Sequence, residues 1–377
     1  MTRLRIHADK IFDGQQFYEH QVLTIEDGKV LSIDDDTTSV DVVVQGMIAP
    51  GFIDLQVNGG GGVLFNDSPS LDNLKTIITA HSQFGTTGML PTLITDKVEV
   101  MAQAADAMAL AIKEGVPGIL GIHFEGPHLS VAKKGTHVQE YIRAISEAEW
   151  QILERKDIGQ ILVTLAPETV STDDIHRMVS LGIKVCLGHT NADFKTAQAA
   201  MDVGADGYTH LFNAMSSIES RAPGVTGCAL LNDQASCGMI IDGHHVDYTT
   251  AKLALKTKPQ GKVFLVTDAM STIGTDQTEF SFFDRTVYLN DGRLTSTTGE
   301  LAGAALDMAT AVKNTHLGIG IVLDEAIRMA SQYPADYINQ GAIRGNLSVG
   351  AQADFVILND QLGVESTWIG GQRVYTK

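Results

Sequence analysis

The sequence predicts an α/β fold, a TIM-like (β/α)8 barrel with a small β-sandwich domain built from both chain ends. From Pro50 onward, short apolar strands alternate with helical patterns over about 300 residues, which implies a parallel sheet with helical crossovers. Several of these strands end in polar side chains, as barrel strands do at their carboxyl ends. The two chain ends lack helical periodicity and consist of strand-like runs separated by turns. With 377 residues, the chain is long enough for one large and one small domain.

The small domain is expected from the two ends together. Near the start, the turn signal Asp27-Gly28 separates strand-like runs at 21–25 and 29–33. The tail from 347 to 374 is strand-like again around Gly370-Gly371. We therefore expect residues 1–48 plus 347–377 to form the small β-sandwich domain and residues 49–346 to form the barrel.

The barrel segment carries recognisable strands and helices in alternation. Helical patterns cover 71–84 and 97–113, and return at 304–314 and 324–331. A hairpin with its turn at 290–292 interrupts the alternation between 280 and 294. The expected strands include 119–124, 161–165, 183–187 and 263–266.

Amino-acid composition and net charge limit the kinds of molecule that the protein could bind. The net charge of −18 and the pI of about 4.9 argue against nucleic acid or an anionic membrane as partner. An anionic ligand would need a local cluster of basic groups. No signal peptide or membrane-spanning run is visible, and three cysteines without a CxxC pair make a disulfide framework improbable. We expect a cytoplasmic protein.

The first barrel strand, PGFIDLQV from Pro50, delivers two amide side chains to one face. Gln56 and Asn58 are two residues apart and so point the same way along a strand. Four glycines follow at 59–62, which let the backbone turn sharply and allow close approach.

Four further strand ends carry side chains suited to metal chemistry. Glu125, His189, His210 and Asp268 each follow an apolar strand or a short strand-like segment. One carboxylate with two imidazoles is a usual ligand set for catalytic zinc, and a further Asp is suited to act as general base on a water. Each residue alone is more often a cap or a surface residue. Four such ends on one barrel face make a shared site the better interpretation.

Motifs along nearly the whole chain resemble the amidohydrolase superfamily, and within it the deacetylases of amino-sugar phosphates. PGFID (50–54) and GNLSVGAQAD (345–354) carry the superfamily resemblance. The motifs similar to the deacetylases are QVNG (56–59), HFEGP (123–127), KKGTH (133–137), HLFNAM (210–215), DGHHVD (242–247) and VTDA (266–269).

This resemblance implies an activity and a set of roles. The reaction would be metal-dependent hydrolysis of N-acetylglucosamine 6-phosphate to glucosamine 6-phosphate and acetate. Glu125, His189 and His210 would bind one divalent metal ion per subunit, zinc first and other divalent metals as alternatives. Asp268 would be the general base and then the acid, acting on a water held by the metal, and His137 would help polarise the acetyl carbonyl. The substrate would be held by Thr136, Asn213, Ala214, Leu301, Ala302 and Gly303, with His245 and Arg221 on the phosphate.

The same resemblance implies a homodimer or higher homo-oligomer, because in the family the arginine comes from the neighbouring subunit. Family members often have serine where Ala302 stands, a change that a backbone contact would survive. Most amidohydrolases carry His-x-His where Gln56 and Asn58 stand. Amides are weak zinc ligands, so one metal is expected, with Gln56 touching it through a water.

Several alternatives stay open. Deacetylation of the galactosamine epimer is compatible with the same motifs. Another amidohydrolase reaction, on a cyclic amide or as a deaminase, would normally need His-x-His. A non-catalytic scaffold is the third alternative, although the four metal and base residues are all present. Arg221 taken alone fits a solvated loop cation equally well, and Lys133-Lys134 fit a solvated pair.

Overall fold

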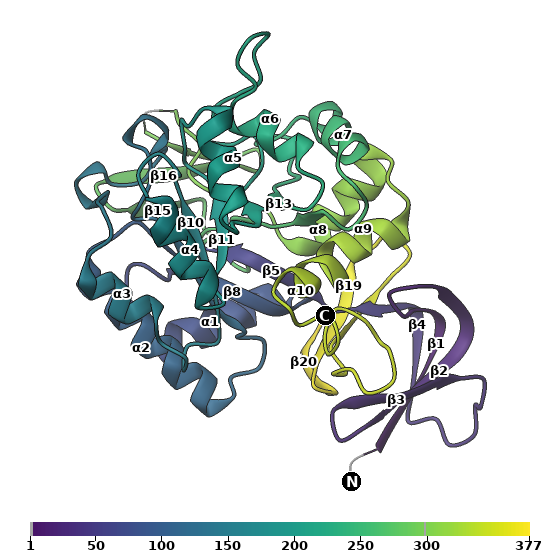
Figure 1. Cartoon of the computed structure of the whole chain (residues 1–377). Coiled ribbons are helices and arrows are strands. Elements are labelled where there is room, and N and C mark those ends of the chain that lie inside the picture. The colour runs from purple at the N-terminus through teal and green to yellow at the C-terminus, as the bar shows by residue number, and fades with distance from the viewer. Residues whose placement is uncertain (1–2, 298) are drawn as a thin grey trace.

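The structure, a computed structural model, describes residues 3–297 and 299–377 (Figure 1). Met1 and Thr2, with which the expected small domain begins, lie outside the described residues. The centre is a sheet of eight parallel strands in chain order. These strands are β5 (Phe52–Val57), β8 (Thr86–Ile94), β9 (Gly121–Glu125), β10 (Gln160–Leu165), β11 (Lys184–Leu187), β12 (Gly207–Tyr208), β13 (Ser236–Met239) and β14 (Val263–Leu265).

The last strand returns to the first and closes the sheet into a barrel. Val57 forms a parallel bridge with Ala269, just beyond β14. The Asp268 amide donates to the Gln56 carbonyl at 2.9 Å, and the Asn58 amide donates to the Ala269 carbonyl at 2.9 Å. The expected (β/α)8 barrel is confirmed, and its closure joins the QVNG and VTDA motifs directly.

Helices follow the strands and cover the outside of the barrel (Figure 1). Helix α1 shows why such segments are helical: Ser70 caps its first turn by accepting from the Asn73 amide, and Leu74, Ile77 and Ile78 form its buried face. The helices are α1 (Leu71–Ser82), α2 (Val98–Glu114), α3 (Glu147–Leu153), α4 (Thr172–Ser180), α5 (Phe194–Asp202), α6 (Gly224–Leu231), α7 (Tyr248–Thr257), α8 (Met308–Lys313), α9 (Leu323–Ala330) and α10 (Gln332–Tyr337), with the 3₁₀ turns η1 (Val131–Lys133) and η2 (Gln139–Tyr141) and the π-helical segment η3 (Asn314–Ile319). None of the helices in the described ranges is long and apolar enough to cross a membrane.

Both chain ends lie in one seven-stranded sheet beside the barrel, as the purple and yellow strands in Figure 1 show. Its buried side includes Phe355 stacked on Trp368, with ring centroids 5.3 Å apart. The expected separate β-unit from the two ends is confirmed, while the boundaries at 48 and 347 stay a prediction. Its strands are β1 (Arg3–Phe12), β2 (Phe17–Glu26), β3 (Lys29–Asp34), β4 (Val42–Pro50), β18 (Phe355–Leu358), β19 (Val364–Ile369) and β20 (Gln372–Thr376).

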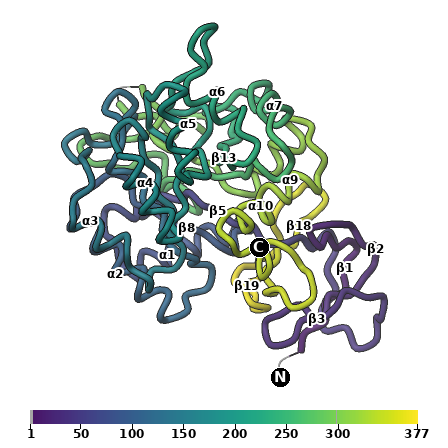
Figure 2. Tube along the Cα trace, in the orientation of Figure 1, coloured from purple at the N-terminus to yellow at the C-terminus, as the bar shows by residue number. Residues whose placement is uncertain are grey.

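Two smaller strand groups lie near the mouth of the barrel. The expected hairpin is present as β16 (Arg285–Asn290) and β17 (Arg293–Ser296), and β15 (Glu279–Phe282) adds a third strand. This sheet packs its apolar side against Leu64, Ile94 and Met270. A two-stranded ribbon, β6 (Gly59–Gly60) and β7 (Val63–Leu64), begins with the first two glycines of the run at 59–62. The segment leading into α6 projects from the barrel as a narrow loop (Figure 2).

Candidate metal centre and active site

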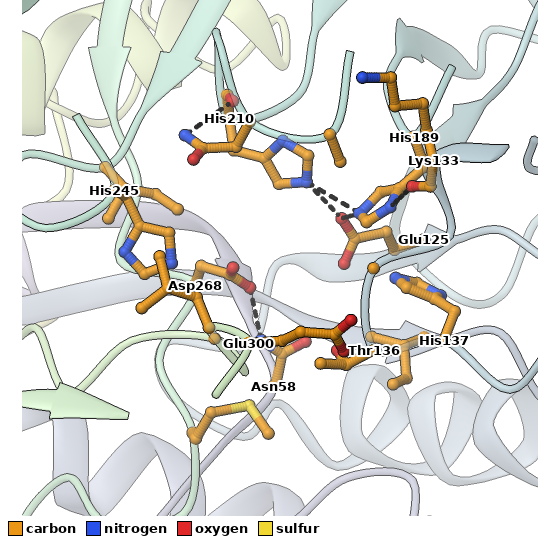
Figure 3. A pocket seen from close by; sticks show the side chains of 18 of the residues that line it. Asn58, Glu125, Lys133, Thr136, His137, His189, His210, His245, Asp268 and Glu300 are labelled. Atoms are coloured by element: carbon orange, nitrogen blue, oxygen red, sulfur yellow. Dashed lines mark hydrogen bonds and ion pairs between the residues drawn. The ribbon is translucent and has the colours of Figure 1, made fainter. Parts of the chain in front are cut away.

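A cavity of about 440 Å³ opens at the carboxyl ends of the barrel strands (Figure 3). Its wall brings together side chains that are far apart in the sequence. Those expected from the sequence and found on this wall are Glu125, Thr136, His137, His189, His210, Asn213, Ala214, His245, Asp268, Leu301 and Gly303.

Three of these residues converge on one point. Glu125 Oε1 lies 3.2 Å from His189 Nε2 and 3.0 Å from His210 Nε2, and the two Nε2 atoms are 3.0 Å apart. His189 Nδ1 donates to the Lys133 carbonyl at 2.8 Å, which leaves the Nε2 lone pair free for a ligand. Carboxylate oxygen and imidazole nitrogen are the donors that zinc and similar ions prefer. The donor set therefore fits one divalent metal ion.

The charge balance at this point favours a cation. Burial acts to raise the pKa of Glu125, but the imidazoles of His189 and His210 beside the carboxylate outweigh it and hold that pKa well below its ordinary value. Burial acts to lower the pKa of His210, yet its hydrogen bond to Glu125 raises the pKa overall. The ionised carboxylate thus attracts positive charge to the place where the two imidazoles meet.

Backbone conformation aims three of the side chains into the cavity. His189, His210 and Asp268 have φ values of 46°, 32° and 53°, in the left-handed region that non-glycine residues rarely adopt. Each such residue costs about 1–2 kcal/mol relative to the ordinary backbone. Strain at three strand ends around one cavity is typical of a functional site.

The amides of the first strand bind the carboxylates. Asn58 Nδ2 donates to Asp268 Oδ1 at 2.6 Å, and Gln56 Nε2 lies 3.1 Å from the same oxygen and 3.2 Å from Glu125 Oε1. Gln56 therefore turns its N–H groups to two anions, and only its amide oxygen remains for the expected water. Burial and the nearby Glu125 raise the pKa of Asp268 to about 6, while the Asn58 hydrogen bond acts in the opposite direction.

A second buried carboxylate, that of Asp54, fixes the backbone next to Asp268. Asp54 accepts the backbone N–H groups of Gln56 and Thr267 at 3.2 Å each, and the Thr267 hydroxyl donates to its other oxygen. Burial raises the pKa of Asp54 to about 7. This clamp ties β5 to the residue before the candidate base.

His137 stands beside the metal ligands as a neutral ring. Burial, followed by the proximity of His189, holds its pKa well below the ordinary value. Its Nδ1 lies 2.8 Å from the hydroxyl of Thr95, which also donates to the Glu125 carbonyl at 3.3 Å. Sequence reasoning missed Thr95, although it directly follows β8 and so lies, like the other site residues, near the carboxyl end of a barrel strand.

Two of the expected substrate residues lie elsewhere. Arg221 is exposed on the projecting loop and borders a different cavity beside α5 and α6. The Ala302 side chain is buried in the apolar cluster under β15–β17, between the lining residues Leu301 and Gly303. The cavity wall also contains Lys133 and Glu300, neither of which was assigned from the sequence.

Removing one ligand should remove the metal. We expect Glu125→Gln to lower the affinity for a divalent ion by at least about 100-fold, because an amide replaces the one anionic ligand. His245→Asn, in the same cavity but outside the ligand set, is the matched control and should retain the metal. Elemental analysis after competition with a chelator measures both. Equal metal retention in the two variants would contradict the assigned ligand set.

Comparison with known proteins agrees with this geometry. The model of the Amidohydrolase family matches residues 47–374. An N-acetylgalactosamine-6-phosphate deacetylase of Shewanella sp. (strain ANA-3) is 48% identical over 333 residues, 88% of this chain and 84% of that protein. An N-acetylglucosamine-6-phosphate deacetylase of Haemophilus influenzae is 36% identical over 329 residues, 86% of each. The crystal structure of N-acetylglucosamine-6-phosphate deacetylase from Pasteurella multocida superposes with a TM-score of 0.95 at 37% identity, covering 100% of both chains. The chain belongs to the amidohydrolase family.

Proposed function

We propose that this protein hydrolyses the N-acetyl group of N-acetylglucosamine 6-phosphate, giving glucosamine 6-phosphate and acetate. The observation that carries the proposal is the Glu125–His189–His210 ligand set facing Asp268 across one cavity. A buried carboxylate opposite a metal site suits amide hydrolysis, which needs a base for water and an acid for the leaving nitrogen. The names of the similar deacetylases supply the substrate class.

We infer that the metal is zinc, one ion per chain, held by Glu125, His189 and His210. A bound divalent ion supplies Lewis acidity, which lowers the pKa of a water and polarises a carbonyl oxygen. Support for a single ion comes from the amide nitrogens of Gln56 and Asn58. They donate to Glu125 and Asp268, in the place where a His-x-His pair would present lone pairs.

Asp268 moves the proton. Its carboxylate takes a proton from the attacking water and returns it to the amide nitrogen as the carbon–nitrogen bond breaks, so acid and base steps balance within one residue. Asn58, at 2.6 Å, fixes the carboxylate and favours the ionised form in which the cycle begins. Neutral His137, held by Thr95, is placed to orient the acetyl group beside the ligand set.

The remaining residues of the cavity are suited to binding the sugar and its phosphate. We propose that Thr136, Asn213, Ala214 and the loop 301–303 hold the sugar, and that His245 binds the phosphate at the end of the cavity near Asp268 (Figure 3). The cytoplasm is the compartment we infer, because Cys186, Cys228 and Cys237 are free and buried, as thiols of a reducing compartment are.

The galactosamine epimer is a second candidate substrate. The specific observation in its favour is the 48% identity to an N-acetylgalactosamine-6-phosphate deacetylase. The two sugars differ only in the orientation of one hydroxyl at C4, which a few hydrogen bonds can distinguish.

Acetate release from four substrates tests the proposal. We expect turnover of N-acetylglucosamine 6-phosphate that is lost on chelation and restored by zinc, with much weaker turnover of unphosphorylated N-acetylglucosamine. The phosphorylated and unphosphorylated galactosamine counterparts, measured in parallel, give the epimer preference as a ratio of kcat/KM. Absence of acetate from both sugar phosphates with metal present would overturn the function.

Asp268→Asn tests the base. We expect turnover to fall by about 10³-fold or more, because proton transfer by a placed side chain contributes on the order of 10²–10⁴ and this residue acts twice. Metal content and KM should change little, since the amide keeps the shape and an acceptor oxygen. Near-normal turnover would exclude Asp268 as the general base.

We propose in addition a homodimer or higher homo-oligomer in which Arg221 completes the neighbouring site. In its own subunit Arg221 lies outside the catalytic cavity, on the exposed hairpin where Glu219 bridges to Ala222. The planar guanidinium can donate two hydrogen bonds to a phosphate, which suits a residue that reaches across an interface.

Subunit mixing tests this arrangement. Arg221→Ala alone should raise KM for the phosphorylated substrate about tenfold or more with a smaller effect on kcat. Co-expression of Arg221→Ala with Asp268→Asn should create mixed dimers in which one site has both groups, so activity with the wild-type KM returns. Arg373→Ala, in the chain-end sheet, is the control. A mixture that shows only the sum of the two variants would place Arg221 outside the neighbouring site.

A further inference from the structure

The turn after β13 contains a buried acid–imidazole pair at the cavity wall. Asp242 Oδ2 lies 2.7 Å from His245 Nδ1, and the exposed fractions of the two side chains are 8% and 7%. Asp242 Oδ1 accepts the backbone N–H groups of His244 and His245, both at 2.8 Å. The Asp242 carboxylate thus fixes the backbone of the turn and also the imidazole ring of His245.

This geometry decides which ring nitrogen a ligand meets. Hydrogen bonds from His245 and the backbone outweigh burial and hold the pKa of Asp242 below its ordinary value, so the carboxylate is ionised and can only accept. His245 Nδ1 must therefore carry a proton, and Nε2 is the nitrogen available in the cavity. A fully ionised phosphate monoester has only acceptors to offer, so a neutral ring with a bare Nε2 would repel it.

We propose that Asp242 is a positioning residue that makes His245 a doubly protonated clamp for the phosphate monoester of the substrate. The ionised carboxylate stabilises the positive ring, and the second proton, on Nε2, is donated to a phosphate oxygen. This inference rests on the proposed function for the identity of the anion. It adds Asp242 as the residue that stabilises a positive charge on His245 in the phosphate site.

The surroundings of the ring support a positive charge. Asp268 faces His245 from the β14 end, and His245 acts to lower the pKa of Asp268. The ring thus lies between two carboxylates. A cation there also offsets part of the protein's net charge of −18, which otherwise opposes an anionic substrate.

A purely structural role for Asp242 predicts a different outcome in the variant Asp242→Asn. The amide oxygen can still accept the two backbone N–H groups, so the turn is retained. Its NH₂ group, however, meets His245 Nδ1 as a donor and favours the neutral ring with its proton on Nε2. That ring still donates one hydrogen bond to phosphate, but without charge, and charge-assisted hydrogen bonds are roughly twice as strong as neutral ones.

The experiment compares KM, kcat and inhibition by inorganic phosphate in four proteins: wild type, Asp242→Asn, His245→Ala and the double variant. We expect Asp242→Asn to raise KM for the phosphorylated sugar and the inhibition constant of phosphate by roughly tenfold, with kcat changed less than about threefold. In the His245→Ala background the same substitution should have almost no further effect.

Asp247→Asn is the matched control. This carboxylate lies five residues further along, caps α7 by accepting the Thr249 amide at 2.7 Å and faces no imidazole. It should change thermal stability little, because Asn caps a helix about as well as Asp does, and it should have no phosphate-specific effect. A rise in KM from Asp242→Asn that persists in the His245→Ala background, or a fall in kcat with KM unchanged, would overturn the proposal.

A measurement on the wild-type chain keeps the proposal testable if Asp242→Asn fails to fold. Nitrogen chemical shifts of the His245 ring, assigned by comparison with His245→Ala, should show both nitrogens protonated when the protein is saturated with inorganic phosphate. A ring with one proton under those conditions would overturn the clamp. Because this readout needs no catalysis, it separates failure of the clamp from failure of the deacetylase function, which the acetate assay on wild type reports.

Discussion

Two buried carboxylates facing one cavity, Glu125 and Asp268, are the constraint on which the rest of the site depends. Burying like charges together is costly unless each is compensated, because a low-dielectric interior magnifies their repulsion. Two imidazoles lie against Glu125, where a divalent ion would add further compensation, while Asn58 and Gln56 donate to Asp268. Gln56 donates to both anions and so bridges them. In this interpretation, Gln56 and Asn58 stabilise the two carboxylates in place of the second metal ion that a His-x-His strand would bind. Because amides are neutral, they add no charge to the site.

Much of the fold and the residues at the strand ends could be predicted from local signals, whereas the other cavity residues were predicted from the family resemblance. Strand–helix alternation and polar residues at strand ends placed Glu125, His189, His210 and Asp268 on one face. Strand β8 was harder to predict, since Pro91 interrupts its apolar run and prolines normally argue against a central strand. Because β8 was not among the predicted strands, Thr95 was not recognised as a residue at the end of a barrel strand.

The parts that could not be predicted are relations between distant segments. That Thr95 binds His137, that Asp54 clamps Thr267, and that Asp242 holds His245 all depend on side-chain geometry after folding. The left-handed backbone at His189, His210 and Asp268 is likewise imposed by the closed barrel, since none of these residue types demands it. The motifs therefore indicated the candidate catalytic groups, and the structure identified the residues that contact them.

The sheet that joins both chain ends has a consequence for biosynthesis. Strand β4 pairs with β18, and the two are separated by about 300 residues of barrel. At a synthesis rate of about 5–20 residues per second, the ribosome needs roughly 15–60 s to make the residues between β4 and β18. During that interval the edge of β4 is unpaired, and its apolar residues are a template for aggregation. Pairing of β18 with β4 therefore comes after the barrel strands have been made, so the chain-end sheet is completed late and links the two ends of the barrel segment.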